Sequence, residues 1–221
     1  MKKIMFNDRY GLTAAVLQGR KTMTRRICKE YATGQLILAS DVESFRFYPD
    51  KNIVEFLMKD GTIKVSVPPY KNNEFVAVAQ SYETLANSGH LDQMTVPANN
   101  PVQLEFKKEY TGKGWSNKMF IRPDLMPHQT QINNFNIEHL QNISDEDCIK
   151  EGIYVNPNPP KWREYDPYEP WPPYVKPYKF TTIKGFCKPQ FAFAYLIDAV
   201  SGKGTWERNP FVFAYSFKLI K

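Results

Sequence analysis

Short strand-like segments divided by tight-turn residues fill the first third of the chain. Residues 45–48, 53–58 and 62–67 have the pattern of three strands, and Asp60-Gly61 between the last two is a strong β-hairpin signal. Residues 75–79 (FVAVA) then form a near-continuous apolar run. Such a run suits a buried strand of a closed β-barrel.

Three other segments have the pattern of short helices. Leu12, Ala15 and Val16 fall at helical spacing, and Gly19 is well placed as a C-terminal cap. Ser144 begins a capping-box pattern (SDED) that opens a helix ending at Gly152. Residues 189–200 resemble an amphipathic helix, and residues 211–220 a closing strand. Strands and helices together predict an α+β fold.

Residues 155–180 change composition sharply, to repeated prolines among tryptophans and tyrosines. Prolines at this density exclude regular helix and central strand, so we expect a long ordered loop or flap. Its aromatic side chains either stack on bases or clamp the loop onto the rest of the fold. Because no internal repeat or linker divides the chain, the flap is expected to be an insertion in a single domain spanning residues 1–221.

Charge and cysteine usage restrict the partners. A net charge of +6 and a pI near 9.0 favour an anionic partner such as nucleic acid. The three cysteines lack a C-x-x-C pair and the three histidines lie far apart, so neither a disulfide framework nor a zinc site is expected. No nucleotide-cofactor fingerprint and no membrane-spanning run occurs. We therefore expect a cytoplasmic protein without metal, cofactor or membrane contact.

The basic segment GRKTMTRR, residues 19–26, is the strongest candidate for the centre of function. A lysine that is desolvated or crowded by cations can lose its charge and act as a base for a neighbouring threonine hydroxyl. Lys21 and Thr24 have this relation if the chain turns between them, because in an extended segment they would face opposite ways. The remaining cations would crowd Lys21 and hold a phosphate or stack on a base; they are Arg20, Arg25 and Arg26. Alternatively, the segment is a solvated charge run that ends a helix.

A second candidate nucleic-acid surface spans residues 115–122 (WSNKMFIR). It mixes aromatic side chains with Lys118 and Arg122, as surfaces that bind single strands do. The alternative is a core strand at residues 119–121 with ordinary flanking cations.

These motifs occur in an order that resembles the ASCH family, especially its larger phage and prophage members. The matching features are GRKTMTRR after the first helix, then LQNISDEDCIKEGI at residues 140–153, then GKGTWERNPFVFAYSF at residues 202–217. The resemblance implies a PUA-like closed β-barrel with a cleft beneath the first helix. With the short flanking helices and the long proline-rich and aromatic-rich insertion read from the sequence, this completes the predicted fold. The resemblance also implies a ligand that is RNA or a modified nucleoside.

Some small members of that family hydrolyse acetylcytidine with a lysine, a threonine and a glutamate. Carried onto this chain, these residues are Lys21, Thr24 and Glu151. Lys21 would be the base, Thr24 the nucleophile, and Glu151 would move a proton or orient the lysine. Alternatively, Glu151 is a solvent-facing carboxylate of an acidic helix. Asp145, Glu146 and Asp147 are the other candidates for the catalytic carboxylate.

The sequence thus predicts binding of RNA or a modified nucleoside in a basic cleft formed by Arg20, Arg25, Arg26, Lys118 and Arg122. The first alternative is an amidohydrolase that removes the acyl group of a nucleoside such as acetylcytidine. The second is a phage accessory protein whose cleft contacts another protein.

Overall fold

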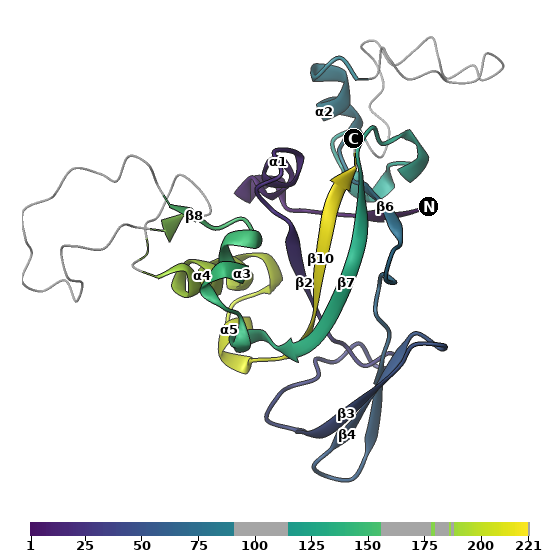
Figure 1. Cartoon of the computed structure of the whole chain (residues 1–221), viewed down its shortest axis with the longest axis vertical. Coiled ribbons are helices and arrows are strands. Elements are labelled where there is room, and N and C mark those ends of the chain that lie inside the picture. The colour runs from purple at the N-terminus through teal and green to yellow at the C-terminus, as the bar shows by residue number, and fades with distance from the viewer. Residues whose placement is uncertain (91–114, 156–177, 180–185, 187, 221) are drawn as a thin grey trace, which may run out of the picture.

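A computed structural model describes residues 1–90, 115–155, 178–179, 186 and 188–220 (Figure 1). The described strands are β1 (Lys2–Ile4), β2 (Met23–Ile27), β3 (Val42–Tyr48), β4 (Ile53–Met58), β5 (Ile63–Ser66), β6 (Phe75–Val78), β7 (Gln129–His139), β8 (Tyr154–Val155), β9 (Tyr178–Lys179) and β10 (Phe211–Ile220). The α-helices are α1 (Leu12–Leu17), α2 (Tyr82–Asn87), α3 (Asp145–Lys150), α4 (Pro189–Ser201) and α5 (Thr205–Arg208). Short 3-10 helices are η1 (Asp8–Tyr10), η3 (Lys118–Phe120), η4 (Pro123–Leu125) and η5 (Leu140–Asn142).

A five-stranded sheet with the order β1-β6-β7-β10-β2 forms the centre of the molecule. Only β1 and β6 pair in parallel; the other neighbours are antiparallel. The long strands β7 and β10 pair along their whole length, and a bulge lies at Ser216/Phe217. β10 is buried over most of its residues, which explains its almost continuous apolar sequence.

A second sheet, β3-β4-β5, is an antiparallel meander that projects from one end of the central sheet (Figure 1). Its inward aromatic side chains contact the start of β10: the Phe56 and Phe45 rings lie 5.1 and 5.5 Å from the Phe211 ring. The three strands expected from residues 45–67 are therefore confirmed, as is the turn at Asp60-Gly61.

The expected closed PUA-like barrel is wrong. Within the described residues, the strands form open sheets, and β1 and β2 are edges that pair only with β6 and β10. The meander packs on the central sheet through its aromatic side chains. The isolated bridges lie in the segment between β2 and β3, where Lys29 pairs with Leu36 and Leu38 with Pro210, and no ladder among the described strands joins the two sheets. The α+β character remains.

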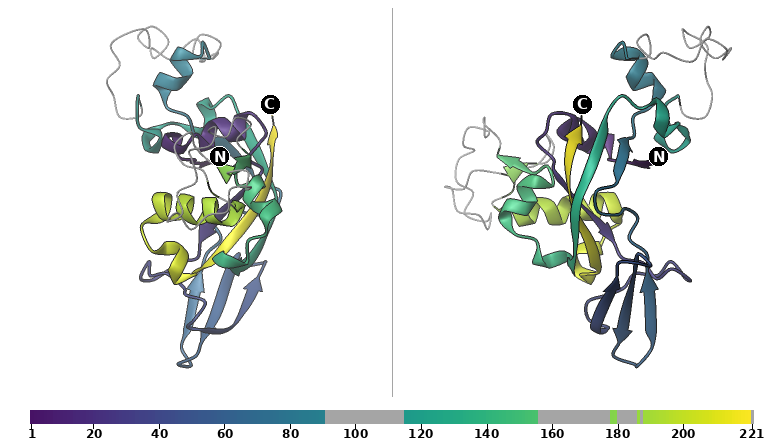
Figure 2. Two further views of the ribbon diagram at one scale, coloured as in Figure 1. Left: turned by 90° about the vertical axis from the view of Figure 1, so that its left-hand side faces the viewer. Right: turned by 45° about the vertical axis from the view of Figure 1, so that its right-hand side comes forward.

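Helices α4 and α5 lie on one side of the central sheet, with α3 beside them (Figure 2). α4 buries Phe193, Leu196 and Ile197, three residues of the apolar face expected from the sequence, whereas the fourth, Val200, is exposed. The three buried side chains belong to the main core. α1 and α3 also form where the sequence predicts them. In contrast, α2, which Ser81 caps, is a helix that the sequence analysis does not predict.

Residues 119–121 were considered as a core strand but lie in and just after η3, with Met119 and Phe120 exposed. The proline-rich flap lies almost entirely outside the described residues; at its ends, β8 pairs with β9. No described helix is long and apolar enough to cross a membrane.

Candidate functional site

A tight turn after α1 places Lys21 at the start of the site. Gly19 adopts a left-handed φ of 72°, and the backbone N–H groups of Arg20 and Lys21 both donate to the carbonyl of Ala15, at 2.9 and 3.0 Å. Glycine reaches this conformation without steric cost. The chain then enters β2, which carries Thr24 and Arg25. This turn precedes Lys21, and Thr24 already lies in the extended strand β2, so the turn expected between Lys21 and Thr24 is not the one observed.

Helix α3 supplies the acidic side of the site. Ser144 caps the helix by accepting a hydrogen bond from the N–H of Asp147 at 3.1 Å, and Glu151 is the residue that ends it. The N–H of Thr22 donates to the carbonyl of Lys150 at 2.9 Å, so the end of α3 is fixed directly against the segment that precedes β2.

Lys21 and Glu151 form a buried ion pair. The Lys21 Nζ donates to Glu151 Oε2 at 2.5 Å and to the Glu151 carbonyl at 2.7 Å, and the two side chains are only 2% and 4% exposed. The solvent-facing reading of Glu151 is therefore wrong. An ammonium has three donors, and the third forms no hydrogen bond with a described residue.

Burial lowers the pKa of Lys21 below its ordinary value of 10.5, because desolvation disfavours the charged amine. The attraction and hydrogen bond of Glu151 oppose this effect but do not cancel it. Repulsion from Arg26 and Arg25 adds to the lowering, as the basic sequence suggests. Lys21 therefore loses its proton at a lower pH than an exposed lysine does.

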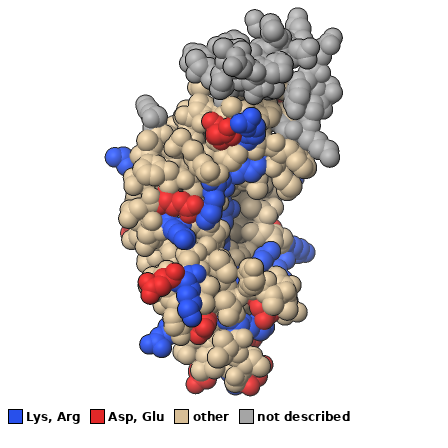
Figure 3. Space-filling view, turned by 90° about the vertical axis from the view of Figure 1, so that its right-hand side faces the viewer, with Lys and Arg blue, Asp and Glu red and all other residues tan. Residues whose placement is uncertain are grey.

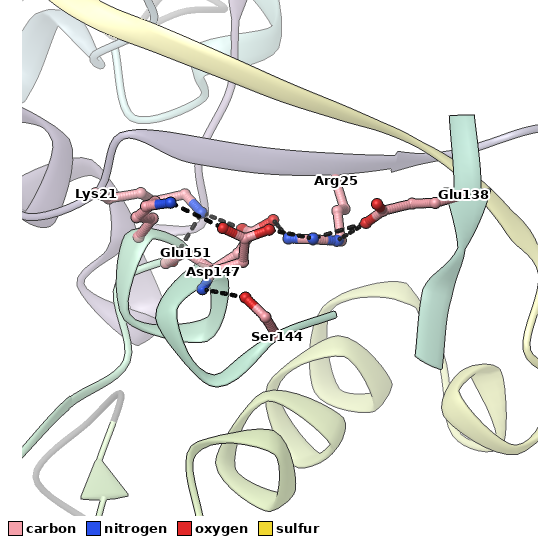
Figure 4. A network of polar contacts seen from close by, with 7 residues as sticks. Lys21, Arg25, Glu138, Ser144, Asp147 and Glu151 are labelled. Carbon is pink, nitrogen blue, oxygen red and sulfur yellow. Dashed lines mark hydrogen bonds and ion pairs between the residues drawn. The ribbon is translucent and has the colours of Figure 1, made fainter. Parts of the chain in front are cut away.

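Arg25 connects Glu151 to two further carboxylates (Figure 4). Its guanidinium donates to Glu138 at 2.7 and 3.0 Å, to Asp147 at 3.2 Å and to Glu151 at 3.3 Å, and its side chain is 1% exposed. Although desolvation acts to lower the pKa of Arg25, the carboxylates of Glu151 and Glu138 outweigh it and raise the pKa. Arg25 is a permanently charged internal group that holds Glu151.

Thr24 faces a pocket of about 80 Å³ beside this network. Its hydroxyl hydrogen-bonds no other described residue, while the Thr24 residue as a whole is 4% exposed. The pocket is lined by Met5, Phe6, Asn7, Leu12, Lys21, Thr24, Arg25, Arg26, Glu151, Phe193, Leu196, Ile197, Val200 and Ser201. The structure therefore brings Lys21, Thr24 and Glu151 to one pocket with an apolar wall from α4.

The other cations expected in a basic cleft are dispersed. Arg26 lines the pocket and donates to the Met5 carbonyl at 2.9 Å. Arg20 lies on the other side of α1 and donates to Gln18 at 2.9 Å. Lys118 is paired with Asp8 at 2.5 Å and Arg122 with Asp124 at 2.5 Å. Lys and Arg side chains do run down the face shown in Figure 3, but Asp and Glu lie among them.

Glu138, a member of the network, and Asn7, which lines the pocket, were not predicted from the sequence. Glu138 lies on β7, across β10 from Arg25 on β2, and this neighbourhood exists only once the sheet order is known. Asp147 was an alternative to Glu151; it instead supports Arg25 while Lys150 holds its other oxygen at 3.0 Å. Desolvation raises the pKa of Asp147, but the hydrogen bonds from Lys150 and Arg25 prevail and lower it.

The side chains described here offer acid–base and nucleophilic chemistry. No group of three or more His, Cys, Asp or Glu residues is placed to bind a metal ion within the described part of the chain. The Thr24 hydroxyl, the Lys21 amine and the Glu151 carboxylate all line one pocket. Within the described residues the Lys21 amine donates to Glu151 and forms no hydrogen bond with Thr24, so a base–nucleophile pair would require the amine to turn toward the hydroxyl. Comparisons with models of protein families, with curated proteins and with solved structures give no match to this chain.

Proposed function

We propose that the protein is an amidohydrolase in which Thr24 is the nucleophile, Lys21 the base and Glu151 the group that orients Lys21. The observation that carries this proposal is the buried Lys21–Glu151 pair beside a threonine hydroxyl that has no hydrogen-bond partner among the described residues. Ionisable groups with perturbed pKa values cluster at functional sites. A purely structural ion pair would not need a free hydroxyl and a pocket at its side.

The reaction begins with the neutral form of Lys21. Its amine removes the proton of the Thr24 hydroxyl as the Thr24 oxygen attacks the amide carbon of the substrate. When the tetrahedral intermediate collapses, the C–N bond breaks, and Lys21 returns the proton to the leaving amine. Water, deprotonated by Lys21, then attacks the threonine ester; the C–O bond to Thr24 breaks, Lys21 returns the proton to the Thr24 oxygen, and the carboxylic acid is released. Glu151 holds Lys21 in place and stabilises its charged form.

Donors for the developing oxyanion come from side chains that line the same pocket. Arg26 and Asn7 both line it, and Arg26, which has five N–H donors, donates one of them to the Met5 carbonyl. A fixed donor aimed at an oxyanion contributes strongly to acyl-transfer catalysis. In the resting arrangement Lys21 is bonded to Glu151, so the Lys21–Thr24 contact forms as the substrate enters.

An acylated nucleoside is the substrate class that we propose. The resemblance of GRKTMTRR and of residues 140–153 to the ASCH family supports a nucleoside, even though the closed barrel expected from the same resemblance is absent. Pockets that enclose a whole small molecule usually measure about 300–1,000 Å³. A pocket of about 80 Å³ therefore suits the acyl end of the substrate.

The direct test is acetate release from acetylcytidine by the purified protein. Thr24→Val removes the hydroxyl and keeps the shape of the side chain, so it should abolish the release and leave the fold intact. Thr22→Val is the matched control, because Thr22 is a neighbour that does not line the pocket. Equal activity in wild type and Thr24→Val would disprove the mechanism.

Binding of a modified nucleoside without turnover is the second candidate function. The observation in its favour is that Glu151 takes two of the three donors of Lys21 in the resting structure. If the protein only binds, acetylcytidine will bind in the pocket and be recovered intact.

A further inference from the structure

A second and larger cavity lies beside α1, and Leu12 of that helix lines both this cavity and the Thr24 pocket. It measures about 340 Å³, within the usual range for small-molecule sites. Arg20 and Gly152 line it, and they are the sequence neighbours of Lys21 and Glu151, which line the Thr24 pocket.

Small residues make room in this cavity. Gly11, Ala14, Ala15 and Gly152 contribute to its lining, and Gly152 adopts a φ of 104°. A Cβ added at Gly152 would lie 3.6 Å from the Cβ of Lys21, which shows how thin the wall is between the cavity and the site.

Two arginines and two tyrosines give the cavity its chemistry. The Arg9 guanidinium lies 5.7 Å from the centre of the Tyr10 ring, and that of Arg20 lies 5.5 Å from the Tyr154 ring. Neither arginine forms an ion pair with a described residue. In this they differ from Arg25, which three carboxylates surround, and from Arg122, which Asp124 holds.

A carboxylate also lines the cavity, and its charge is already balanced. Asp8 is paired with Lys118 at 2.5 Å, and Lys118 is further held by the Thr13 hydroxyl at 2.8 Å. The charge that remains for a ligand is therefore that of Arg9 and Arg20. The second oxygen of Asp8 can still accept a hydrogen bond from a sugar hydroxyl.

From this arrangement we infer that the cavity is a binding site for a nucleotide unit that carries a phosphate. The base would stack against Tyr154, and the phosphate would be held by Arg9 and Arg20, because guanidinium groups bind phosphate oxygens through paired N–H donors. The unit is either a free nucleoside monophosphate or the phosphorylated end of an RNA strand. This site does not depend on the hydrolysis proposed for the Thr24 pocket.

The test measures binding of CMP, cytidine, inorganic phosphate and a short 5′-phosphorylated RNA by calorimetry. The protein carries Thr24→Val throughout, so that hydrolysis plays no part. CMP should bind more tightly than cytidine or phosphate, and Arg9→Gln with Arg20→Gln should weaken CMP by about tenfold for each charge-assisted hydrogen bond lost, with little effect on cytidine. Tyr154→Leu should weaken both CMP and cytidine.

The matched control is Arg46→Gln with Lys51→Gln. These cations lie 5.7 and 5.9 Å from the Tyr48 ring on the β3–β4 hairpin, a similar cation–tyrosine cluster without the cavity. Competition between CMP and the RNA would identify a strand end as a source of the ligand; binding of CMP alone would identify the free nucleotide. CMP affinity that the two arginine substitutions leave unchanged, or that the control lowers equally, would overturn the inference. Failed acetate release with intact CMP binding would count against the hydrolase proposal only.

Discussion

At the scale of single residues, the site consists of charged side chains whose burial costs desolvation free energy. Lys21, Arg25 and Glu151 have almost no exposed side-chain surface, so each must be compensated by its partners. Each of these three charged groups has at least one oppositely charged partner within 3.3 Å. Removing Lys21 alone leaves the Glu151 carboxylate buried without its closest counter-charge. Removing Lys21 and Glu151 together removes both charges of the pair.

We therefore expect Lys21→Met to lower the free energy of unfolding by about 3–5 kcal/mol, because the Glu151 charge stays buried. The double variant Lys21→Met/Glu151→Met should recover most of the loss, since Arg25 keeps Glu138 and Asp147. Denaturant unfolding of the wild type, both single variants and the double variant measures the coupling. Additive losses would mean that the two side chains do not act as a pair.

The lowered pKa of Lys21 gives hydrolysis a defined pH dependence. The neutral amine is the active form, so the rate should rise with pH and level off below 10.5, the ordinary pKa of lysine. The attraction and hydrogen bond of Glu151 raise the pKa of Lys21. Glu151→Gln should therefore move the midpoint of the rise to lower pH while it also lowers the plateau rate.

A pH–rate profile of kcat for wild type and Glu151→Gln checks this expectation, and Glu146→Gln on the same helix is the control. A midpoint that moves upward in Glu151→Gln, or one that does not move, would show that Glu151 does not act through Lys21.

At the scale of elements, α3 and the turn after α1 set the geometry. Both could be predicted from the sequence because their signals are local: Ser144 is the N-cap and Gly19 adopts the left-handed turn. The choice of Glu151 among four acidic residues followed from the family resemblance and not from a local sequence pattern. The α2 helix was missed because its apolar residues, Tyr82 and Leu85, are few and the segment is short.

Ser144→Ala should cost about 1 kcal/mol of stability through loss of the cap. Because Glu151 ends the same six-residue helix, we also expect weaker positioning of Lys21 and a lower kcat. Thermal unfolding together with acetate release measures both effects. Ser44→Ala, at an exposed position of β3, is the control. A loss of stability in Ser144→Ala without any change in kcat would show that α3 does not position Lys21 for catalysis.

At the scale of the whole molecule, the order of strands in the central sheet determines which distant residues become neighbours, and the sequence alone did not predict that order. Most strands were predictable from apolar patterning, but their closure into a barrel was not, because pairing between distant strands leaves no local signal. The open order β1-β6-β7-β10-β2 places Glu138 beside Arg25 from 113 residues away. Because the sequence does not show which distant segments lie together, it also predicted a cleft of five cations that the structure does not contain. Of those five, Arg25 is buried in the network and the other four are dispersed.

The most direct test of the account is the mass of the intact protein, quenched in acid shortly after mixing with acetylcytidine. If Thr24 is the nucleophile, a fraction of the protein gains one acetyl group, fragmentation places it on Thr24, and Thr24→Val gains none. Acetate release from a protein that is never acetylated, or acetylation that persists in Thr24→Val, would contradict the account.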